Sequence, residues 1–177
     1  MKLYVVRHGQ TDWNLDHKVQ GITDIELNDL GRNQAYELQE LIKDIEIDIV
    51  ISSPLLRAKE TAEILVDGKL LVLLDDRLTE RSWGDNEGKS IDEVDRINCW
   101  NVSLNVDTNN IEKLHDFMNR VSSFIEEIKL VYSNKNVLIV AHSAVVRVVH
   151  YLLEEIPEDG NLSKINIPNL RVLEYEI

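Results

Sequence analysis

The fold is decided by the stretch Leu3-Tyr4-Val5-Val6-Arg7-His8-Gly9 near the start of the chain. Its first four residues form an unbroken run of apolar residues that favour β-structure. Such a run is typical of a strand buried on both faces. Two similar runs, Ile49-Val50-Ile51 and residues 137–141, are each followed by residues at helical spacing. This alternation predicts an α/β fold, a three-layer α/β/α sandwich with a mainly parallel central sheet.

The other elements are predicted from the spacing of apolar residues. Strands are expected over residues 3–6, 48–52, 70–74 and 137–141, with late candidates at 165–167 and 170–175. Helices are expected over residues 29–45, 57–65, 111–131 and 144–154. The first helix has Asn28 as its expected N-cap. One apolar face is expected on it, formed by Leu30, Leu38, Leu41, Ile42 and Ile45.

Length and composition limit the possible classes of protein. The 177 residues predict one domain covering 1–177. The net charge of −13 disfavours nucleic acid and anionic membranes as partners. Cys99 is the only cysteine, so neither an internal disulfide nor a cysteine metal site is expected. No apolar run has the length of a signal peptide or a membrane span, so we expect a soluble cytoplasmic protein.

Basic residues follow several of the predicted strands. Arg7 and His8 end the first strand, Arg57 comes shortly after the second, and His142-Ser143 follows the strand at 137–141. Ligands of open α/β sheets bind beyond the carboxyl ends of the strands, so these side chains are expected to meet there. In a protein of such negative charge, this cluster indicates an anion site.

Phosphate fits such a cluster. Arginine presents a planar fork of donors, and the helix expected to begin near Ser143 offers free backbone N–H groups. A neutral imidazole such as His8 is a competent nucleophile near neutral pH. Glu80, which follows the strand at 70–74, is the candidate proton donor, and bound phosphate is expected to raise its pKa.

Five blocks of sequence occur in one order along nearly the whole chain. They are Arg7-His8-Gly9-Gln10-Thr11-Asp12-Trp13-Asn14; Gln20-Gly21 with Asp24, Leu27, Gly31, Gln34 and Ala35; Ser52-Ser53-Pro54-Leu55-Leu56-Arg57-Ala58 with Thr61-Ala62; Leu78, Glu80, Gly84 and Gly88; and Val140-Ala141-His142-Ser143 with Arg147. Together these blocks resemble the motifs of the histidine phosphatase superfamily, also called the phosphoglycerate mutase-like family. Five blocks in order are far more specific than any one of them.

The resemblance implies a role for each matching residue. His8 would be phosphorylated and then dephosphorylated. Arg7, Arg57 and His142 would hold the phosphoryl group. Asn14 would contribute a side-chain donor.

The same resemblance implies how the rest of the site works. Glu80 would protonate the leaving group and then help to activate water. The backbone N–H of Ser143 would complete the phosphate pocket, and Gln20 and Gly21 are expected to contact the substrate. Enzymes of this family use no metal and no organic cofactor, so none is expected here.

The chain departs from the family pattern at several positions. Ser143 stands where the family commonly has glycine, and Thr79 stands where many phosphatases carry arginine. Asn86 replaces a frequent aromatic residue, and the stretch before the long helix is reduced to Asn110-Ile111-Glu112-Lys113. These changes affect the expected contacts with the substrate. None of them removes a residue with an expected catalytic role.

Aromatic residues and further histidines have simpler expected roles. Trp13 and Trp83 are expected to pack in the core or at its edge, and His17 is expected to be a solvated loop residue. Trp100, within the polar, irregular stretch 98–110, is the best candidate for contact with a substrate.

Three functions are compatible with these residues: a phosphomonoesterase, a phosphoglycerate mutase-type phosphoryl transferase and a non-catalytic phosphate-binding protein. The connection 88–112 is short, Ile91 replaces a lysine of the mutases, and only Lys89 and Arg96 are basic between Gly88 and Glu112. A substrate with two strongly negative ends is therefore expected to be held poorly. The pair Glu80-Arg81 resembles the mutases and keeps that alternative open.

The presence of both His8 and Glu80 favours an enzyme over a binding protein. The expected partner is a small phosphate ester, with α-ribazole phosphate and a broad range of esters as the two candidates. The sequence carries no indication of oligomeric state.

Overall fold

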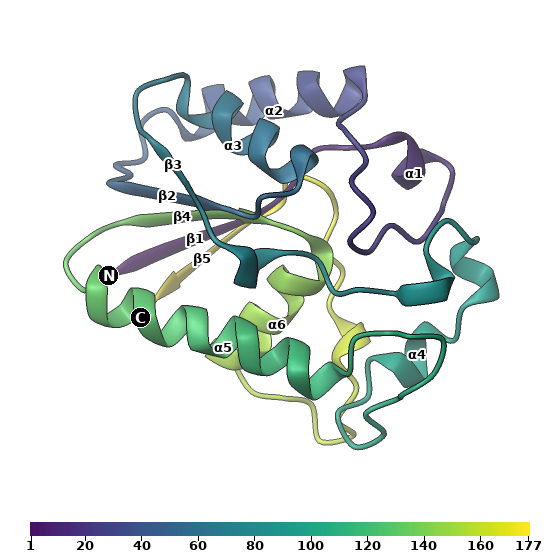
Figure 1. Ribbon diagram of the computed structural model, residues 1–177. Helices are drawn as coiled ribbons and strands as arrows, with labels where there is room; N and C mark the ends of the chain where they lie inside the picture. The colour runs from purple at the N-terminus through teal and green to yellow at the C-terminus, as the bar shows by residue number, and fades with distance from the viewer.

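The computed structural model describes all residues, Met1–Ile177, and contains a five-stranded sheet in the order β3-β2-β4-β1-β5 (Figure 1). The strands are β1 Lys2–Arg7, β2 Ile49–Ser52, β3 Val72–Leu74, β4 Val137–Ala141 and β5 Val172–Glu176. The pairs β1–β4, β2–β4 and β2–β3 are parallel, and only β5 is antiparallel, along the edge of β1. The prediction of a mainly parallel sheet is confirmed.

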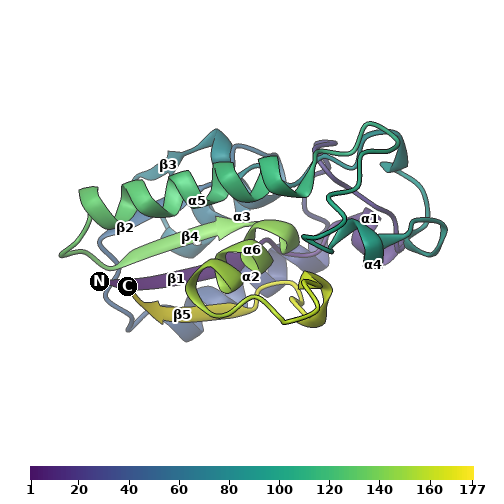
Figure 2. The same cartoon turned by 90° about the horizontal axis from the view of Figure 1, so that it is seen from below.

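Helices cover both faces of the sheet. Helices α2 (Asp29–Ile42) and α3 (Leu56–Val66) pack on one face, and α5 (Leu114–Val131) and α6 (Ser143–Leu153) pack on the other (Figures 1 and 2). The central strands supply both cores by alternation: Val5 and Ile139 face α5 and α6, while Val6 and Leu138 face α2 and α3. This double burial explains why the strand sequences are continuously apolar.

The connections at the carboxyl ends of the parallel strands form a thick cap on the sheet. The cap contains the short helices α1 (Asp12–Leu15) and α4 (Arg96–Cys99), and both chain termini lie at the opposite end (Figures 1 and 2). Four 3₁₀ turns complete the connections: η1 Asp76–Leu78, η2 Gly84–Asn86, η3 Ile91–Glu93 and η4 Leu162–Lys164. No helix combines the length and the apolar character needed to cross a membrane.

Several predicted details are wrong. Helix α2 ends at Ile42, and two members of its expected apolar face, Leu30 and Leu41, are exposed because the helix packs through Ala35, Leu38 and Ile42. Helix α5 begins at Leu114 rather than at residue 111. The stretch 98–110 is irregular as expected except at its start, where α4 ends at Cys99, and Trp100 within it is buried.

The late strand expected at residues 165–167 does not form. Instead, the carbonyls of Ile165 and Ile167 accept hydrogen bonds from the side chains of Arg147 and Arg7. These two contacts tie the segment to arginine side chains of the site instead of to a neighbouring strand.

Candidate active site

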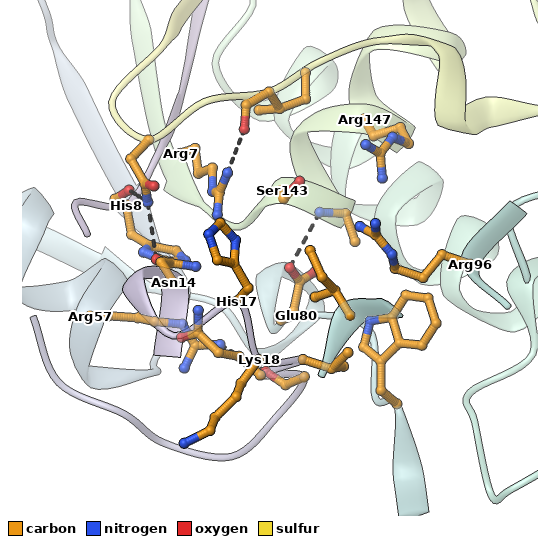
Figure 3. Close-up of a pocket in the computed structure, with 18 of the residues that line it drawn as sticks. Arg7, His8, Asn14, His17, Lys18, Arg57, Glu80, Arg96, Ser143 and Arg147 are labelled. Atoms are coloured by element: carbon orange, nitrogen blue, oxygen red, sulfur yellow. Dashed lines mark hydrogen bonds between the residues drawn. The ribbon is translucent and has the colours of Figure 1, made fainter. Parts of the chain in front are cut away.

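A cavity of about 490 Å³ opens at the carboxyl ends of β1 and β4 (Figure 3). Eight of the nine predicted site residues line it: Arg7, His8, Asn14, Gln20, Gly21, Arg57, Glu80 and Ser143. The ninth, His142, is fully buried beside the cavity, and its ring packs edge-on against His8 with 5.1 Å between the centroids. The structure therefore brings all nine residues together from four regions of the chain.

His8 follows β1 and is held in one tautomer. Its backbone N–H extends the pairing with β4 by donating to Ala141 O at 2.9 Å. Its ring Nδ1 lies 2.7 Å from Gly9 O, and because a carbonyl can only accept, Nδ1 carries the proton. Nε2 is left with a free lone pair. Burial, reinforced by the charges of Arg57 and Arg7, holds the pKa of His8 well below its usual range, so the ring is neutral at pH 7.

The backbone around His8 is fixed by side chains from distant elements. Thr61 Oγ1 on α3 accepts from Gly9 N–H at 3.1 Å. The Asn169 amide donates to His8 O at 2.8 Å and to Gly9 O at 3.1 Å. Neither residue had been assigned a role from the sequence, since only the fold brings them beside the loop.

Asn14 has its amide oriented by two donors. Its Oδ1 accepts from Thr11 N–H at 3.2 Å within the capping box of α1, and from the Asn169 amide at 3.3 Å. With Oδ1 engaged, the Nδ2 donors of Asn14 are available to a ligand in the cavity.

Arg7 and Arg57 are positively charged groups without carboxylate partners. Arg57 is fully buried and donates to Thr23 O at 2.9 Å and Gly21 O at 2.7 Å, while Arg7 donates to Ile167 O. The Nε atoms of both are buried without an acceptor. Burial lowers the pKa of Arg7 to about 10, with Arg147 and Arg57 adding to the effect, and lowers that of Arg57 as well. Such groups favour binding of an anion.

His142 and Ser143 begin helix α6. His142 is the N-cap residue and its Nε2 lies 2.8 Å from Ser53 Oγ, while its buried Nδ1 has no partner. Burial is also the main reason why the pKa of His142 lies well below its usual range. Ser143 lines the cavity as the first residue of the helix, where its N–H has no acceptor within the helix. The helix start therefore directs free donors into the cavity.

Glu80 is a buried carboxyl group in the wall of the same cavity. One of its oxygens accepts from Arg81 N–H at 2.9 Å. The other accepts from Ala144 N–H at 3.3 Å (Figure 3). Burial raises the pKa of Glu80, and these hydrogen bonds and the charges of Arg57 and Arg7 oppose the rise. The direction agrees with the expectation from the sequence, and burial is its cause in the structure.

The cavity also contains residues that the sequence analysis had not placed in the phosphate site. Arg96, Arg147, Lys18, Asn166 and Asn169 line it, as do His17, Trp83 and Trp100. The expectation that a substrate with two strongly negative ends is held poorly rested on the basic residues between Gly88 and Glu112 alone, and the structure adds Arg147 on α6 to the lining of the cavity. The four-residue spacing from Ser143 to Arg147 was a signal that could have found it.

Trp100 lines the cavity, but two arginine side chains pack over its ring. The guanidinium carbons of Arg147 and Arg81 lie 4.6 Å and 5.1 Å from its ring centroid. Only 4% of Trp100 is exposed, so its ring packs mainly against these cations rather than being open to a substrate. No three His, Cys, Asp or Glu side chains are grouped in a way that could hold a metal ion.

Comparison with known proteins agrees with this geometry. The chain is 44% identical over 153 residues to PhoE, an uncharacterised phosphatase of Bacillus subtilis, covering 86% of this chain and 75% of PhoE. It is 37% identical over 159 residues to phosphoglycerate mutase-like protein 4 of Arabidopsis thaliana, covering 82% and 68% of the two chains. The crystal structure of the α-ribazole phosphatase of Shigella flexneri superposes with a TM-score of 0.86 at 27% identity, covering 100% of this chain and 91% of that one. The family model of the histidine phosphatase superfamily (branch 1) matches residues 3–177, and the chain belongs to this superfamily.

Proposed function

We propose that the protein is a phosphomonoesterase that hydrolyses a small phosphorylated metabolite through a phosphohistidine at His8. The observation that carries the proposal is the state of His8: its Nδ1–H is bound to Gly9 O, its ring is neutral, and its Nε2 is free. A nucleophile in this state, beside two unpaired arginines and a buried carboxyl group, suits transfer of a phosphoryl group.

The phosphate of the substrate would bind among Arg7, Arg57, Asn14 and the N–H of Ser143. These groups supply charged and neutral donors that a phosphate dianion requires. His142, behind His8, would add its ring N–H, since its Nδ1 has no partner within the protein. Protein side chains thus supply the positive charge in the proposed mechanism, and no metal or cofactor is assigned a role.

In the first step, Nε2 of His8 attacks phosphorus while the bond from phosphorus to the ester oxygen breaks. Glu80 gives its proton to that oxygen, and the alcohol leaves. In the second step, Glu80, now a carboxylate, takes a proton from water as the water oxygen attacks the phosphohistidine. The P–N bond breaks, inorganic phosphate is released, and Glu80 is protonated again.

Hydrolysis is favoured over phosphoryl transfer to a second substrate by the position of Arg81. The pair Glu80-Arg81 was the feature that resembled the mutases. Arg81 is fully buried, donates to the carbonyls of Glu112 and Cys99, and is not among the residues that line the cavity. Its role is therefore to hold the cap together rather than to bind a substrate.

Release of inorganic phosphate from a panel of α-ribazole phosphate, 3-phosphoglycerate and an aryl phosphate tests the proposal. We expect release from at least one ester, loss of that release in His8→Ala, and an acid-labile phosphoprotein in wild type alone. Release no greater than that of His8→Ala from every ester would overturn the proposal. Isomerisation of 3-phosphoglycerate without phosphate release would support the mutase alternative. Cytoplasmic location and a one-domain organisation stay predictions.

A further inference from the structure

Glu80 lies on residues 79–82, the acid segment, which belongs to no helix or strand. A general acid must keep its proton within hydrogen-bond distance of the leaving oxygen, so the backbone that carries it has to be fixed. In this protein, the groups that fix the acid segment come from helix α5 and from the residues just before it.

Arg120 on α5 binds the backbone on which Glu80 is carried. Its Nη1 donates to Arg77 O and to Thr79 O, each at 2.7 Å, and its Nη2 donates to Glu80 O at 3.1 Å. Its Nε and Nη2 also donate to the carboxylate of Glu112, at 2.7 Å and 2.9 Å. A guanidinium has five N–H groups, and these five hydrogen bonds use all of them.

Glu112 holds the acid segment on the other side of Glu80. Its Oε2 accepts from Ser82 N–H at 3.2 Å, and its own N–H donates to Ser82 O at 3.0 Å. The guanidinium of Arg120 lies over the buried ring of Phe117, with its central carbon 4.5 Å from the centroid. The backbone is therefore attached to α5 both before and after Glu80.

This pattern distinguishes Arg120 from the arginines of the cavity. Arg7, Arg57 and Arg147 line the cavity, and each has a buried Nε without an acceptor. Arg120 is not among the lining residues, and it has no donor left for a ligand. Its guanidinium therefore acts on the protein backbone rather than on a substrate.

We infer that Arg120, oriented by Glu112, is a positioning residue for the general acid and sets the place of Glu80 relative to the leaving oxygen. This inference rests on the proposed phosphatase activity. Lysine keeps the charge of Arg120, but it has three N–H donors instead of five and no planar fork. Arg120→Lys should therefore release part of the acid segment, and the Glu80 carboxyl group should lose its fixed distance from the ester oxygen.

The test uses two leaving groups, because only a poor leaving group needs the proton of Glu80. It compares kcat/KM for an alkyl phosphate and an activated aryl phosphate, since kcat/KM covers only the steps up to release of the alcohol. Misplacing a group by about 1 Å can cost 10²-fold, and we expect Arg120→Lys to lose about that much with the alkyl phosphate. With the aryl phosphate it should lose less than about threefold.

A double variant shows whether Arg120 acts through Glu80. In Glu80→Gln the proton donor is absent, so its position no longer matters. Adding Arg120→Lys to Glu80→Gln should therefore lower kcat/KM for the alkyl phosphate by less than about threefold more. Independent effects would multiply to the full loss of both single variants, and that result would overturn the inference.

Arg77→Lys is the matched control, because Arg77 lies in η1 next to the acid segment and its side chain binds Asp75 and Glu127 instead of that backbone. It makes the same substitution and should leave the ratio of the two kcat/KM values as in wild type. Glu112→Gln is a milder variant for the case that Arg120→Lys does not fold, since it keeps the size and one acceptor oxygen. It should show the same selective loss, at about tenfold.

The outcomes separate the two levels of the proposal. Equal losses for both esters in the folded variants, or no loss for either, would overturn the positioning role. The same selective loss in Arg77→Lys would also overturn it. In each of these cases wild type still hydrolyses both esters, and the phosphatase proposal stands. Failure of wild type to release phosphate from any ester contradicts the phosphatase proposal itself.

Discussion

At the scale of single residues, burial moves the pKa values of His8 and Glu80 in opposite directions. His8 stays neutral well below its usual pKa of about 6.5, and Glu80 stays protonated above its usual pKa of about 4.3. Activity toward alkyl phosphates should therefore be greatest between the lowered pKa of His8 and the raised pKa of Glu80. It should fall at lower pH as His8 gains a proton, and at higher pH as Glu80 loses one. A pH profile of kcat/KM, with Glu80→Gln lacking the alkaline fall, checks this. A maximum above pH 8 would contradict it.

The role of Glu80 as proton donor can be separated from any role in binding. Poor leaving groups require protonation, and good ones do not. Glu80→Gln should reduce kcat by about 10²–10⁴-fold for an alkyl phosphate. For an activated aryl phosphate the reduction in the first step should be much smaller, and rapid-quench measurement of alcohol release would resolve it. Similar losses for both esters would count against Glu80 as the acid.

Asn169 is a positioning residue that the sequence did not reveal. Its amide joins the carbonyls of His8 and Gly9 to the side chain of Asn14. Asn169→Ala should lower kcat/KM about tenfold, because a misplaced nucleophile is costly, and should also weaken the fixed orientation of Asn14. The acid limb of the pH profile should shift, which a purely structural loss would not produce. Asn98→Ala, at an exposed position on α4, provides the control.

The site residues that topology alone could predict share one property: each follows a strand or begins a helix, whereas Asn14, Gln20 and Gly21 were predicted only from the family resemblance. Arg7, His8 and His142 stand directly at strand ends, so the topology of a parallel sheet placed them at one edge. Arg96 and Asn169 reach the cavity through connections whose paths depend on tertiary packing. No local pattern of sequence specifies such paths.

At the scale of elements, helix α2 positions the His8 loop by direct backbone contact. A Cβ built on Gly31 would lie 2.1 Å from Gln10 O, and one built on Gly9 would lie 2.6 Å from Gly31 O. Alanine usually stabilises a helix interior relative to glycine by up to about 1 kcal/mol. Here Gly31→Ala should instead destabilise the protein by about 1–3 kcal/mol through overpacking, and should lower kcat. Thermal unfolding and steady-state kinetics check both effects.

Gly68→Ala is the control for this substitution. Gly68 has a φ of +69° and no atom within 4 Å of its Cβ position. Alanine there should cost about 1 kcal/mol of backbone strain and leave kcat unchanged. Greater stability of Gly31→Ala than of wild type would show that the loop and helix can separate freely.

Elements were predicted correctly where both of their faces are covered by other elements, and less well where only one face is covered. Strand β4 is apolar throughout because both of its faces are covered, so its bounds were predicted correctly. In α2, Leu30 and Leu41 satisfied the helical pattern yet remain exposed, since the pattern allows a wider apolar face than the neighbouring helix covers. Short helices such as α1 and α4 are stabilised by their caps and contacts, and four residues are too few to show a period.

At the scale of the whole molecule, a net charge of −13 surrounds a positively charged cavity. Surface charges are screened by salt far more than buried ones. Raising NaCl from about 10 to 200 mM at pH 7.5 should therefore relieve self-repulsion and raise Tm by a few °C. Near pH 4.7, the isoelectric point, the same addition should have little effect on Tm. A fall in Tm at pH 7.5 would mean that ion pairs outweigh repulsion.

The order of the strands was beyond prediction from this single sequence. The alternation of strands and helices predicted a parallel sheet, but placing β1 between β4 and β5 requires contacts between residues more than one hundred positions apart. The antiparallel direction of β5 likewise depends on the course of residues 154–171, which cross the cap before returning along β1.

The stack of Arg147, Trp100 and Arg81 has an optical consequence. All three tryptophans lie in the cap: Trp83 and Trp100 line the cavity, and Trp13 approaches Gly88 beside it. Intrinsic fluorescence excited at the indoles therefore reports on this end of the molecule and hardly on the sheet beneath. A ligand that draws Arg147 toward itself would change the electric field at Trp100 and shift its emission. Ligand binding could thus be followed by tryptophan fluorescence in the unlabelled protein, before any bond of the ligand is broken.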